Sequence, residues 1–189
     1  MQLEDLSNNI LIKFKEISET FGGFQQRTKL RCPEGCGKCC FKPEISCSPF
    51  ELLPLAFHLL KDGRAVSFLD NIKSLEVSHC PLLEVTNAEL GYGRCTEYEY
   101  RPFLCRAFGV TARHGKNSQI DYSVCKVLQE DKIFSADFMS SQEEIPFMNI
   151  WKKRFESLDP HLQEKEVPIK EGLIFMLEKV LLWDSLQKT

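Results

Sequence analysis

The clearest chemical potential of this 189-residue sequence lies in its nine cysteines. Five of them occur within the seventeen residues RCPEGCGKCCFKPEISC, from Arg31 to Cys47, and two of these, Cys39 and Cys40, are adjacent. Proteins use thiols at this density in a disulfide framework, in a metal or iron–sulfur site, or as a reactive redox pair. The other residues of the chain have to discriminate among these three uses.

A disulfide framework is the least favoured use. The N-terminal residues include Glu4 and Asp5 where a secretory signal would be basic and then apolar, so we expect a cytoplasmic protein whose thiols stay reduced. The odd number of cysteines points the same way, because complete internal pairing would leave one over. The most apolar stretches are too short or too interrupted by charges to span a bilayer, so no membrane segment is expected.

The spacing of the first four cysteines suits a metal site instead. In CPEGCGKCC they are separated by three, two and no residues, and two glycines permit the tight turns that let thiolates converge on one ion. Two or three of the four are expected to reach one metal. Adjacent side chains point apart in most backbone conformations, so one of Cys39 and Cys40 should serve a second ion, bridge, or remain a free buried thiol. The four candidates are Cys32, Cys36, Cys39 and Cys40.

The other candidate ligands lie far downstream of this loop. Cys80 begins the motif CPLL, Cys95 and Cys105 flank the segment TEYEYRPFL, and Cys125 ends a predicted hairpin. They can complete tetrahedral thiolate sets if the hairpins fold back on the first loop. His79 is the only histidine in a ligand-like neighbourhood, although a lone histidine is more often exposed or bonded structurally.

Several polar residues near these cysteines could support bound thiolates. Four thiolates give a net charge of about −2 on a zinc ion or on an oxidised [4Fe-4S] cluster, and Arg94, Arg101 and Arg106 could offset it. Tyr98 and Arg101 stand one helical turn apart, so both could face the cluster and donate hydrogen bonds to thiolates. The alternatives are ordinary surface ion pairs for the arginines, and a core aromatic residue, capped by Arg101, for Tyr98.

Three blocks, CPEGCGKCC, CPLL and CTEYEYRPFLCRAF, occur in this order between Cys32 and Cys125. Together they resemble the YkgJ-type cysteine-cluster family, whose members are described as zinc- or iron-chelating. The resemblance spans about half of the chain and leaves the two ends outside it. The family motif has two-residue gaps throughout, whereas three residues separate Cys32 from Cys36 here. The resemblance implies the ligands Cys32, Cys36, Cys39, Cys40, Cys80, Cys95 and Cys105, to which spacing and count add Cys125.

Cys47 is left out of the candidate ligand set. It lies just before the capping-box sequence SPFE, where a small buried thiol can anchor the entry of a helix as well as an apolar side chain can.

The first functional hypothesis is therefore a metal-binding protein that chelates zinc or iron. Eight thiols are enough for two four-ligand sites or for one cluster with spare thiols, and thiolates accept zinc and iron–sulfur clusters such as [4Fe-4S] alike. The alternative is an iron–sulfur enzyme or a redox or metal-delivery protein, because a similar cluster occurs in flagellin lysine N-methylases. No dinucleotide fingerprint, phosphate loop or nucleophile elbow is present as an independent enzyme signature. The net charge of −3 argues against a general nucleic-acid binder, and no protein partner is indicated.

The elements expected to position these thiols form one mostly helical α+β domain over residues 1–189, with short hairpins around a central cysteine cluster at about 27–126. Apolar residues at steps of three and four predict a helical arm over residues 2–21, ended by Gly22-Gly23. The capping box SPFE predicts a helix from Pro49 to about Lys61, and a weaker pattern predicts one over Ala65 to Leu75.

Two hairpins and a helical C-terminal part are predicted for the remaining segments. The residues around Asn87 and those around Gly115 predict two hairpins, separated by a short helical turn that Pro102 begins. The C-terminal part, residues 140–187, is expected to be helical. One helix should open with Ser and Glu cap residues, and the final helix should run from Ile169 to Leu186. The first of these helices should present Ile145, Met148, Trp151 and Phe155 on one face.

Overall fold

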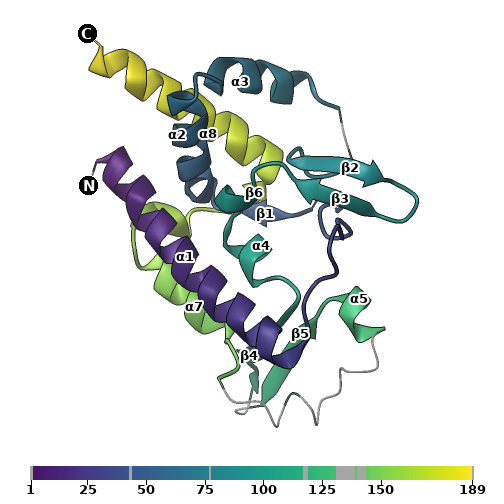
Figure 1. Cartoon of the computed structure of the whole chain (residues 1–189). Coiled ribbons are helices and arrows are strands. Elements are labelled where there is room, and N and C mark those ends of the chain that lie inside the picture. Colours follow the sequence, from purple (N-terminus) through teal and green to yellow (C-terminus); the bar gives the residue numbers. More distant parts are fainter. Residues whose placement is uncertain are drawn as a thin grey trace.

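A computed structural model describes residues 2–42, 44–76, 78–116, 119–130, 139 and 144–188. Over these residues the chain is mostly helical and contains three two-stranded antiparallel sheets, which confirms the predicted α+β class (Figure 1). In chain order the elements are α1 (Leu3–Thr28), β1 (Ser46–Cys47), the 3₁₀ helix η1 (Pro49–Leu52), α2 (Leu53–Lys61), α3 (Ala65–Ser74), β2 (Leu83–Asn87), β3 (Tyr92–Cys95), η2 (Tyr98–Tyr100), α4 (Phe103–Ala107), β4 (Val110–His114), β5 (Ile120–Val124), α5 (Lys126–Gln129), α7 (Met148–Glu156), η4 (Pro160–Gln163), β6 (Val167–Pro168) and α8 (Ile169–Gln187).

Helix α1 is longer than the sequence pattern suggested. It continues through Gly22-Gly23 to Thr28, so the predicted stop at the glycines is wrong. Two glycines cost a helix about 2 kcal/mol relative to alanine. Phe24 lies on the buried face beyond them and is 1% exposed, so its packing offsets that cost. The helix ends where Lys29 takes a left-handed conformation with φ of 61°.

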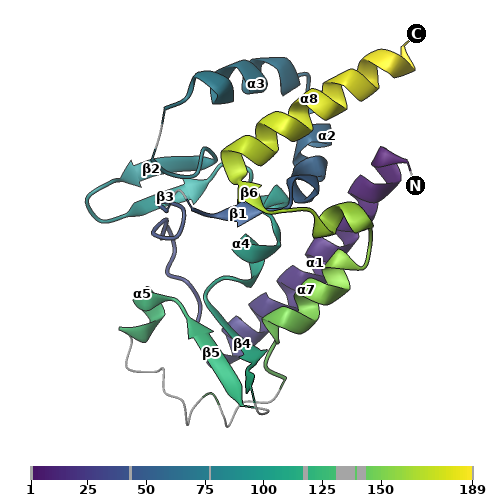
Figure 2. The same ribbon diagram turned by 180° about the vertical axis from the view of Figure 1, so that it is seen from behind.

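The main core is formed where the long helices meet. Helix α8 lies between α2 and α3, and α1 packs against α2, α4 and α7 (Figure 2). In the centre the ring of Phe155 stacks on Phe14 with 5.4 Å between centroids, and on Phe103 with 5.8 Å. Aromatic side chains bury large apolar areas, so these rings fix how α7 and α4 lie on α1.

The capping-box glutamate joins two helix starts. The Glu51 carboxylate accepts hydrogen bonds from the backbone N–H of Ser48, at 3.1 Å, and from that of Phe103, at 2.7 Å. The first bond is the predicted return arm of the capping box, and the second ties η1 to the beginning of α4.

Both predicted hairpins are present. In β2–β3, Leu83 lies opposite Cys95, and in β4–β5, Val110 lies opposite Val124. The short helical turn between the hairpins is α4. These hairpins place Cys95 and Cys125 at or just beyond strand ends that return toward the N-terminal loop.

The C-terminal helices differ from the prediction at one end. Helix α8 has the expected bounds to within a residue, but α7 begins at Met148, so the prediction that Ile145 belongs to this helix is wrong. Pro146 explains the difference, because the residue before a proline disfavours the helical conformation. The predicted serine cap falls on residues outside the described ranges. No helix in those ranges is both long and apolar enough to cross a bilayer.

Candidate metal centre

The cysteine loop is held against the β2–β3 hairpin as an additional edge. Residues 31–42 run from the end of α1 to this hairpin, and α5 lies beside their path (Figure 1). The N–H of Gly37 donates to the carbonyl of Gly91 at 3.1 Å, and the N–H of Gly93 donates to Gly35 at 2.9 Å. A β-carbon on Gly37 would lie 3.1 Å from the Gly93 nitrogen, so the loop and strand β3 can approach this closely only with glycine at position 37.

Cys39 and Cys40 point to the same side of the loop, which corrects the expectation that adjacent side chains diverge. Their Sγ atoms are 3.8 Å apart. The N–H groups of Cys40 and Phe41 both donate to the carbonyl of Gly37, so the backbone makes a tight helical turn here, and neighbouring residues do not point in opposite directions. Two sulfurs bound at about 2.3 Å to one tetrahedral zinc would also lie about 3.8 Å apart.

The two adjacent thiols have opposite acidities. A hydrogen bond from the Cys40 thiol, with help from backbone N–H groups and the charge of Arg101, lowers the pKa of Cys39 to about 6 against the effect of burial. The same hydrogen bond and burial raise the pKa of Cys40, which therefore stays protonated. Cys39 is the thiol of this pair that supplies a thiolate at neutral pH.

Three downstream thiols lie next to this pair. Burial is the largest cause of the raised pKa of Cys80, Cys95 and Cys105, and in each case a negative charge on Cys39 contributes to the rise. For Cys80 the pKa rises to about 11. All three side chains back onto the main apolar core. The backbone N–H of Cys80 also donates to the carbonyl of Cys40 at 2.7 Å.

The remaining candidates lie at the other end of the loop. Burial and the neighbouring Cys36 thiol raise the pKa of Cys32 to about 12, with smaller contributions from Cys39 and Cys125. Cys125 precedes α5, and its N–H donates to the carbonyl of Gly109 at 2.7 Å. The fold therefore brings Cys125 near Cys32, 93 residues away in the sequence.

The cysteine sulfurs suit a thiophilic metal, although the described side chains do not yet surround a single ion. Zinc and iron–sulfur clusters both accept thiolate ligands, and metal binding would displace the protons of thiols whose pKa burial has raised. Among the residues that the structure describes, no three Cys, His, Asp or Glu side chains are grouped closely enough to hold one ion. Cys39 and Cys40 have the sulfur–sulfur distance of such a site, so further ligands have to turn toward them.

Cys47 lies on the core side of the cluster. It is 1% exposed, pairs with Val167 across β1–β6, and burial raises the pKa of its thiol. Charges on Cys105 and Cys80 add to that rise, so Cys47 is close to the cluster as well as to the helix entry.

The residues expected to support the thiolates play different parts. The Arg101 guanidinium lies 3.3 Å from the centroid of the Tyr98 ring and donates to the carbonyl of Tyr98 at 3.0 Å. Its charge contributes to lowering the pKa of Cys39 and opposes the rise that burial causes in the pKa of Cys95 and Cys105. Tyr98 is 57% exposed, so the reading of it as a core aromatic residue is wrong.

Arg106 and Arg94 face other groups. Arg106 donates to the carbonyls of Arg101 and Glu99 and, at 2.8 Å, to the hydroxyl of Ser18 on α1. Burial, followed by the charge of Arg101, lowers the pKa of Arg106 to about 10. Arg94 forms an exposed ion pair with Glu84 at 2.6 Å, as the surface alternative supposed.

The ring of His79 contacts the backbone of the next residue and one aromatic side chain. Its Nδ1 lies 3.0 Å from the carbonyl oxygen of Cys80, and its ring packs edge-on against Phe41.

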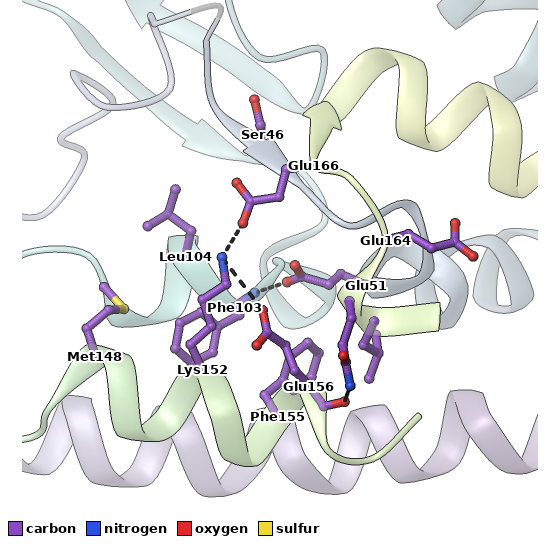
Figure 3. Close-up of a pocket in the computed structure, with 12 residues that line it drawn as sticks. Ser46, Glu51, Phe103, Leu104, Met148, Lys152, Phe155, Glu156, Glu164 and Glu166 are labelled. Carbon is purple, nitrogen blue, oxygen red and sulfur yellow. Dashed lines mark hydrogen bonds and ion pairs between the residues drawn. The ribbon is translucent and has the colours of Figure 1, made fainter. Parts of the chain in front are cut away.

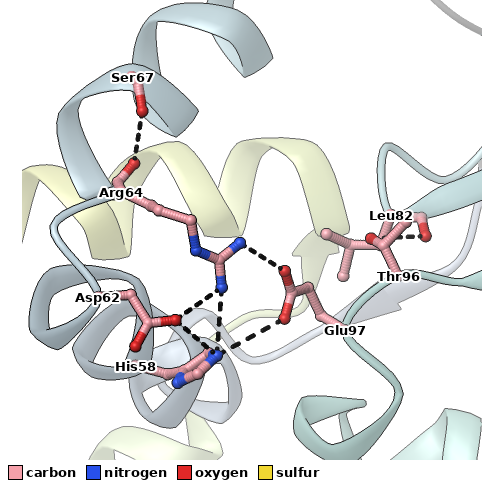
Figure 4. A network of polar contacts seen from close by, with 7 residues as sticks. All are labelled: His58, Asp62, Arg64, Ser67, Leu82, Thr96 and Glu97. Carbon is pink, nitrogen blue, oxygen red and sulfur yellow. Dashed lines mark hydrogen bonds and ion pairs between the residues drawn. The ribbon is translucent and has the colours of Figure 1, made fainter.

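A polar network that the sequence did not reveal anchors the tyrosine-containing block to the helices. Arg64 forms ion pairs with Glu97 at 3.1 Å and with Asp62 at 3.0 Å, and its guanidinium is 3.2 Å from Nε2 of His58 (Figure 4). His58 also stacks on Tyr100 with 4.4 Å between centroids. Glu97 follows Cys95 by two residues, so this network fixes the backbone beside a candidate ligand. No motif marks these residues, because they come together only when α2 meets η2.

Comparison with curated proteins and with solved structures yielded no match. A family model described as "CxxCxxCC: Putative zinc- or iron-chelating domain" matches residues 31–132, a span that contains all nine cysteines of the chain. The match includes the cysteine loop, both hairpins and α4. Because it covers more than half of the 189 residues, the chain belongs to this zinc- or iron-chelating family.

Proposed function

We propose that this protein binds zinc or iron, either as single ions or as an iron–sulfur cluster, through the thiolates of its cysteine cluster. The proposed ligands are drawn from Cys32, Cys36, Cys39, Cys40, Cys80, Cys95, Cys105 and Cys125. A bound metal would supply structural cross-links between the loop, the β2–β3 hairpin and α4.

The observation that carries this proposal is the convergence of thiols from separate segments on Cys39. Cys40 is adjacent to Cys39 in the loop, with 3.8 Å between their sulfurs. Cys80, Cys95 and Cys105 come from later segments, and a negative charge on Cys39 raises the pKa of each of the three. Disulfides have a sulfur–sulfur distance of about 2.05 Å, and Cys39 and Cys40 are not at that distance. Free thiols near one thiolate can supply the ligands of a thiophilic metal once they turn toward it.

Arg101 supports the same proposal through charge. A tetrathiolate site with zinc or with an oxidised [4Fe-4S] cluster carries a net charge of about −2. The Arg101 guanidinium is the cation that several of these thiols share, and Tyr98 and the backbone hold it in place. It offsets negative charge without occupying a ligand position.

Metal analysis of anaerobically purified protein tests the proposal. Iron with acid-labile sulfide and a brown colour would identify a cluster, and a colourless protein with zinc would identify zinc sites. We expect Cys105→Ser to lose metal, because a lost ligand removes folding free energy directly. Cys47→Ala is the matched control, a second buried cysteine close by, and should keep the metal content of the parent. Metal-free parent protein with every thiol titrating freely would refute the proposal.

A second candidate function, in thiol redox chemistry or metal delivery, is favoured by the 3.8 Å spacing of the Cys39 and Cys40 sulfurs. In the redox case the pair would form a disulfide by exchange with an external disulfide, which leaves as two thiols after accepting two electrons and two protons. A protein purified without metal that forms this disulfide reversibly would favour the second candidate over the first.

A further inference from the structure

Arg106, in α4, donates a hydrogen bond from each nitrogen of its guanidinium group. Nε donates to the carbonyl of Arg101 at 2.7 Å, and Nη1 donates to the hydroxyl of Ser18, on α1, at 2.8 Å. Nη2 donates to the carbonyl of Glu99. The guanidinium carbon also lies 4.3 Å from the centroid of the Phe14 ring. A planar group held at three nitrogens and one face has a fixed orientation, so it fixes the backbone at residues 99 and 101 relative to α4.

Arg101 holds the backbone next to Arg106 in return. Its Nε donates to the carbonyl of Tyr98 at 3.0 Å, and its Nη1 donates to the carbonyl of Cys105 at 3.5 Å. Together Arg101 and Arg106 form a guanidinium clamp, in which each side chain binds the backbone that carries or adjoins the other. The clamp lies in the segment that joins the candidate ligands Cys95 and Cys105, so it restricts how their backbones can move apart.

The beginning of α4 is attached separately. Figure 3 shows the Glu51 carboxylate accepting the backbone N–H of Phe103, the first residue of this helix, at 2.7 Å. Cys105 lies between this attachment and the guanidinium clamp. A helix of five residues has little stability of its own, so the two attachments set the position of the Cys105 backbone.

The guanidinium clamp carries two positive charges and has no carboxylate partner among the residues that the structure describes. Its acceptors there are backbone carbonyls and one hydroxyl, which are all neutral. Both side chains are half-buried, and partial removal of a charge from water costs free energy unless an anion lies near. A centre of four thiolates with zinc, or with an oxidised [4Fe-4S] cluster, has a net charge of about −2, which matches the two guanidiniums.

We infer that Arg106 is a positioning residue for the metal centre. Through the carbonyls of Glu99 and Arg101 it fixes the Arg101 guanidinium and the Cys105 backbone beside the thiolates that bind the metal. This inference rests on the proposed function of metal binding. Because Arg106 acts through Arg101 and by the geometry of its planar fork, a lysine at this position keeps the charge without keeping the positioning.

The test is a chelator competition on the full chain, reconstituted anaerobically with cobalt(II). Arg106→Gln and Arg106→Lys should each weaken cobalt retention about tenfold. Arg101→Gln combined with Arg106→Gln should also weaken it about tenfold, rather than the hundredfold expected of independent residues.

Two control variants should retain cobalt as the parent does. Arg94→Gln removes the same charge next to Cys95, but from an exposed arginine that pairs with Glu84. Ser18→Ala removes only the bond between the guanidinium clamp and α1. Weaker retention in Arg94→Gln, equal to that in Arg106→Gln, would overturn the inference, because general charge would then suffice.

Hydrogen exchange of the metal-free chain gives a second readout. The N–H of Tyr100, which donates to the carbonyl of Glu97 at 3.0 Å, should exchange about tenfold faster in Arg106→Lys, while the amides of α8 keep their protection. A residue that only stabilised the whole fold would change both. If Arg106→Gln does not fold, Arg106→Lys and this exchange decide.

The outcomes separate this inference from the proposed function. A parent chain that holds no metal would overturn both. A parent chain that retains cobalt, with equal retention in Arg106→Lys or a hundredfold loss in the double variant, would overturn the positioning role of Arg106 alone.

Discussion

Glu51 makes a specific contribution to the pH dependence of folding. Its pKa rises from 4.5 to about 7 on folding, mainly because the carboxylate is buried. A change of one pKa unit corresponds to about 1.4 kcal/mol, so the rise corresponds to about 3 kcal/mol of unfolding free energy. Since the folded pKa is the higher one, this stability is fully present below about pH 4.5 and is lost as the pH rises to about 7.

The sign distinguishes Glu51 from ion-paired carboxylates elsewhere in the chain. A salt-bridged carboxylate has a lowered folded pKa and adds stability as the pH rises, whereas Glu51 removes it over the same interval. Its hydrogen bonds to the N–H groups of Ser48 and Phe103 favour the ionised form but do not outweigh burial. The measured curve for the parent protein therefore contains both signs, and a variant is needed to separate them.

Urea unfolding of the parent and of Glu51→Gln, at a series of pH values between about 4 and 8, provides that separation. Glutamine has no charge to bury, so the difference between the two unfolding free energies should change by about 3 kcal/mol across the interval and then become constant. Thiol ionisation affects both proteins alike and cancels in the difference. The amide can accept from only one of the two N–H groups, which adds a pH-independent offset. A difference that stays flat from about pH 4 to 8 would refute the argument.

Three further predictions concern the core, the cluster and the polar network. Phe155→Ala should lower the unfolding free energy by about 3–5 kcal/mol in urea titrations, because the ring is 1% exposed and stacks on two others. Arg101→Gln should weaken metal retention about tenfold in a chelator competition, while the thermal unfolding of the metal-free protein changes little. Equal metal retention in the variant and the parent would contradict the proposal that Arg101 offsets the charge of the thiolates. Arg64→Ala should cost about 1 kcal/mol or less in urea titrations, despite its contacts with Glu97 and Asp62, because the guanidinium is exposed to screening solvent.

The sequence was sufficient where one local signal dominated and insufficient where packing competed with it. The apolar period located α1 and α8, and the SPFE capping box located η1 and α2. Gly22-Gly23 was misread as a stop because the burial of Phe24, which decides the matter, depends on residues far along the chain. Pro146 indicates that α7 begins after it, but Ile145 fits the apolar spacing of the helix and was assigned to it for that reason.

The candidate site shows the same division at closer range. Cysteine type and order predicted a set of candidate ligands, and the family match agrees with the motif that carried the resemblance. That the side chains of Cys39 and Cys40 point to the same side could not be predicted from their adjacency. It depends on the tight turn in which the N–H groups that follow Cys39 donate to the carbonyl of Gly37. The buried Glu51 was recognised as a capping residue, but its second bond to Phe103 joins residues 52 positions apart.

Helix α4 explains how the cysteine cluster and the helical core are mechanically connected. In five residues it places Phe103 against Phe155 in the core, Cys105 next to the Cys39 thiolate, and Arg106 on Ser18 of α1. Its first N–H is held by the buried Glu51. A helix this short has little stability of its own, so its position is set by these four attachments. Loss of a metal bound through Cys105 would remove one attachment while the core retains the others, so we expect the loop and the β2–β3 hairpin to loosen before α1, α2 and α8 do. Hydrogen exchange in metal-bound and metal-free protein would measure this order, and equal loss of protection in α8 would contradict it.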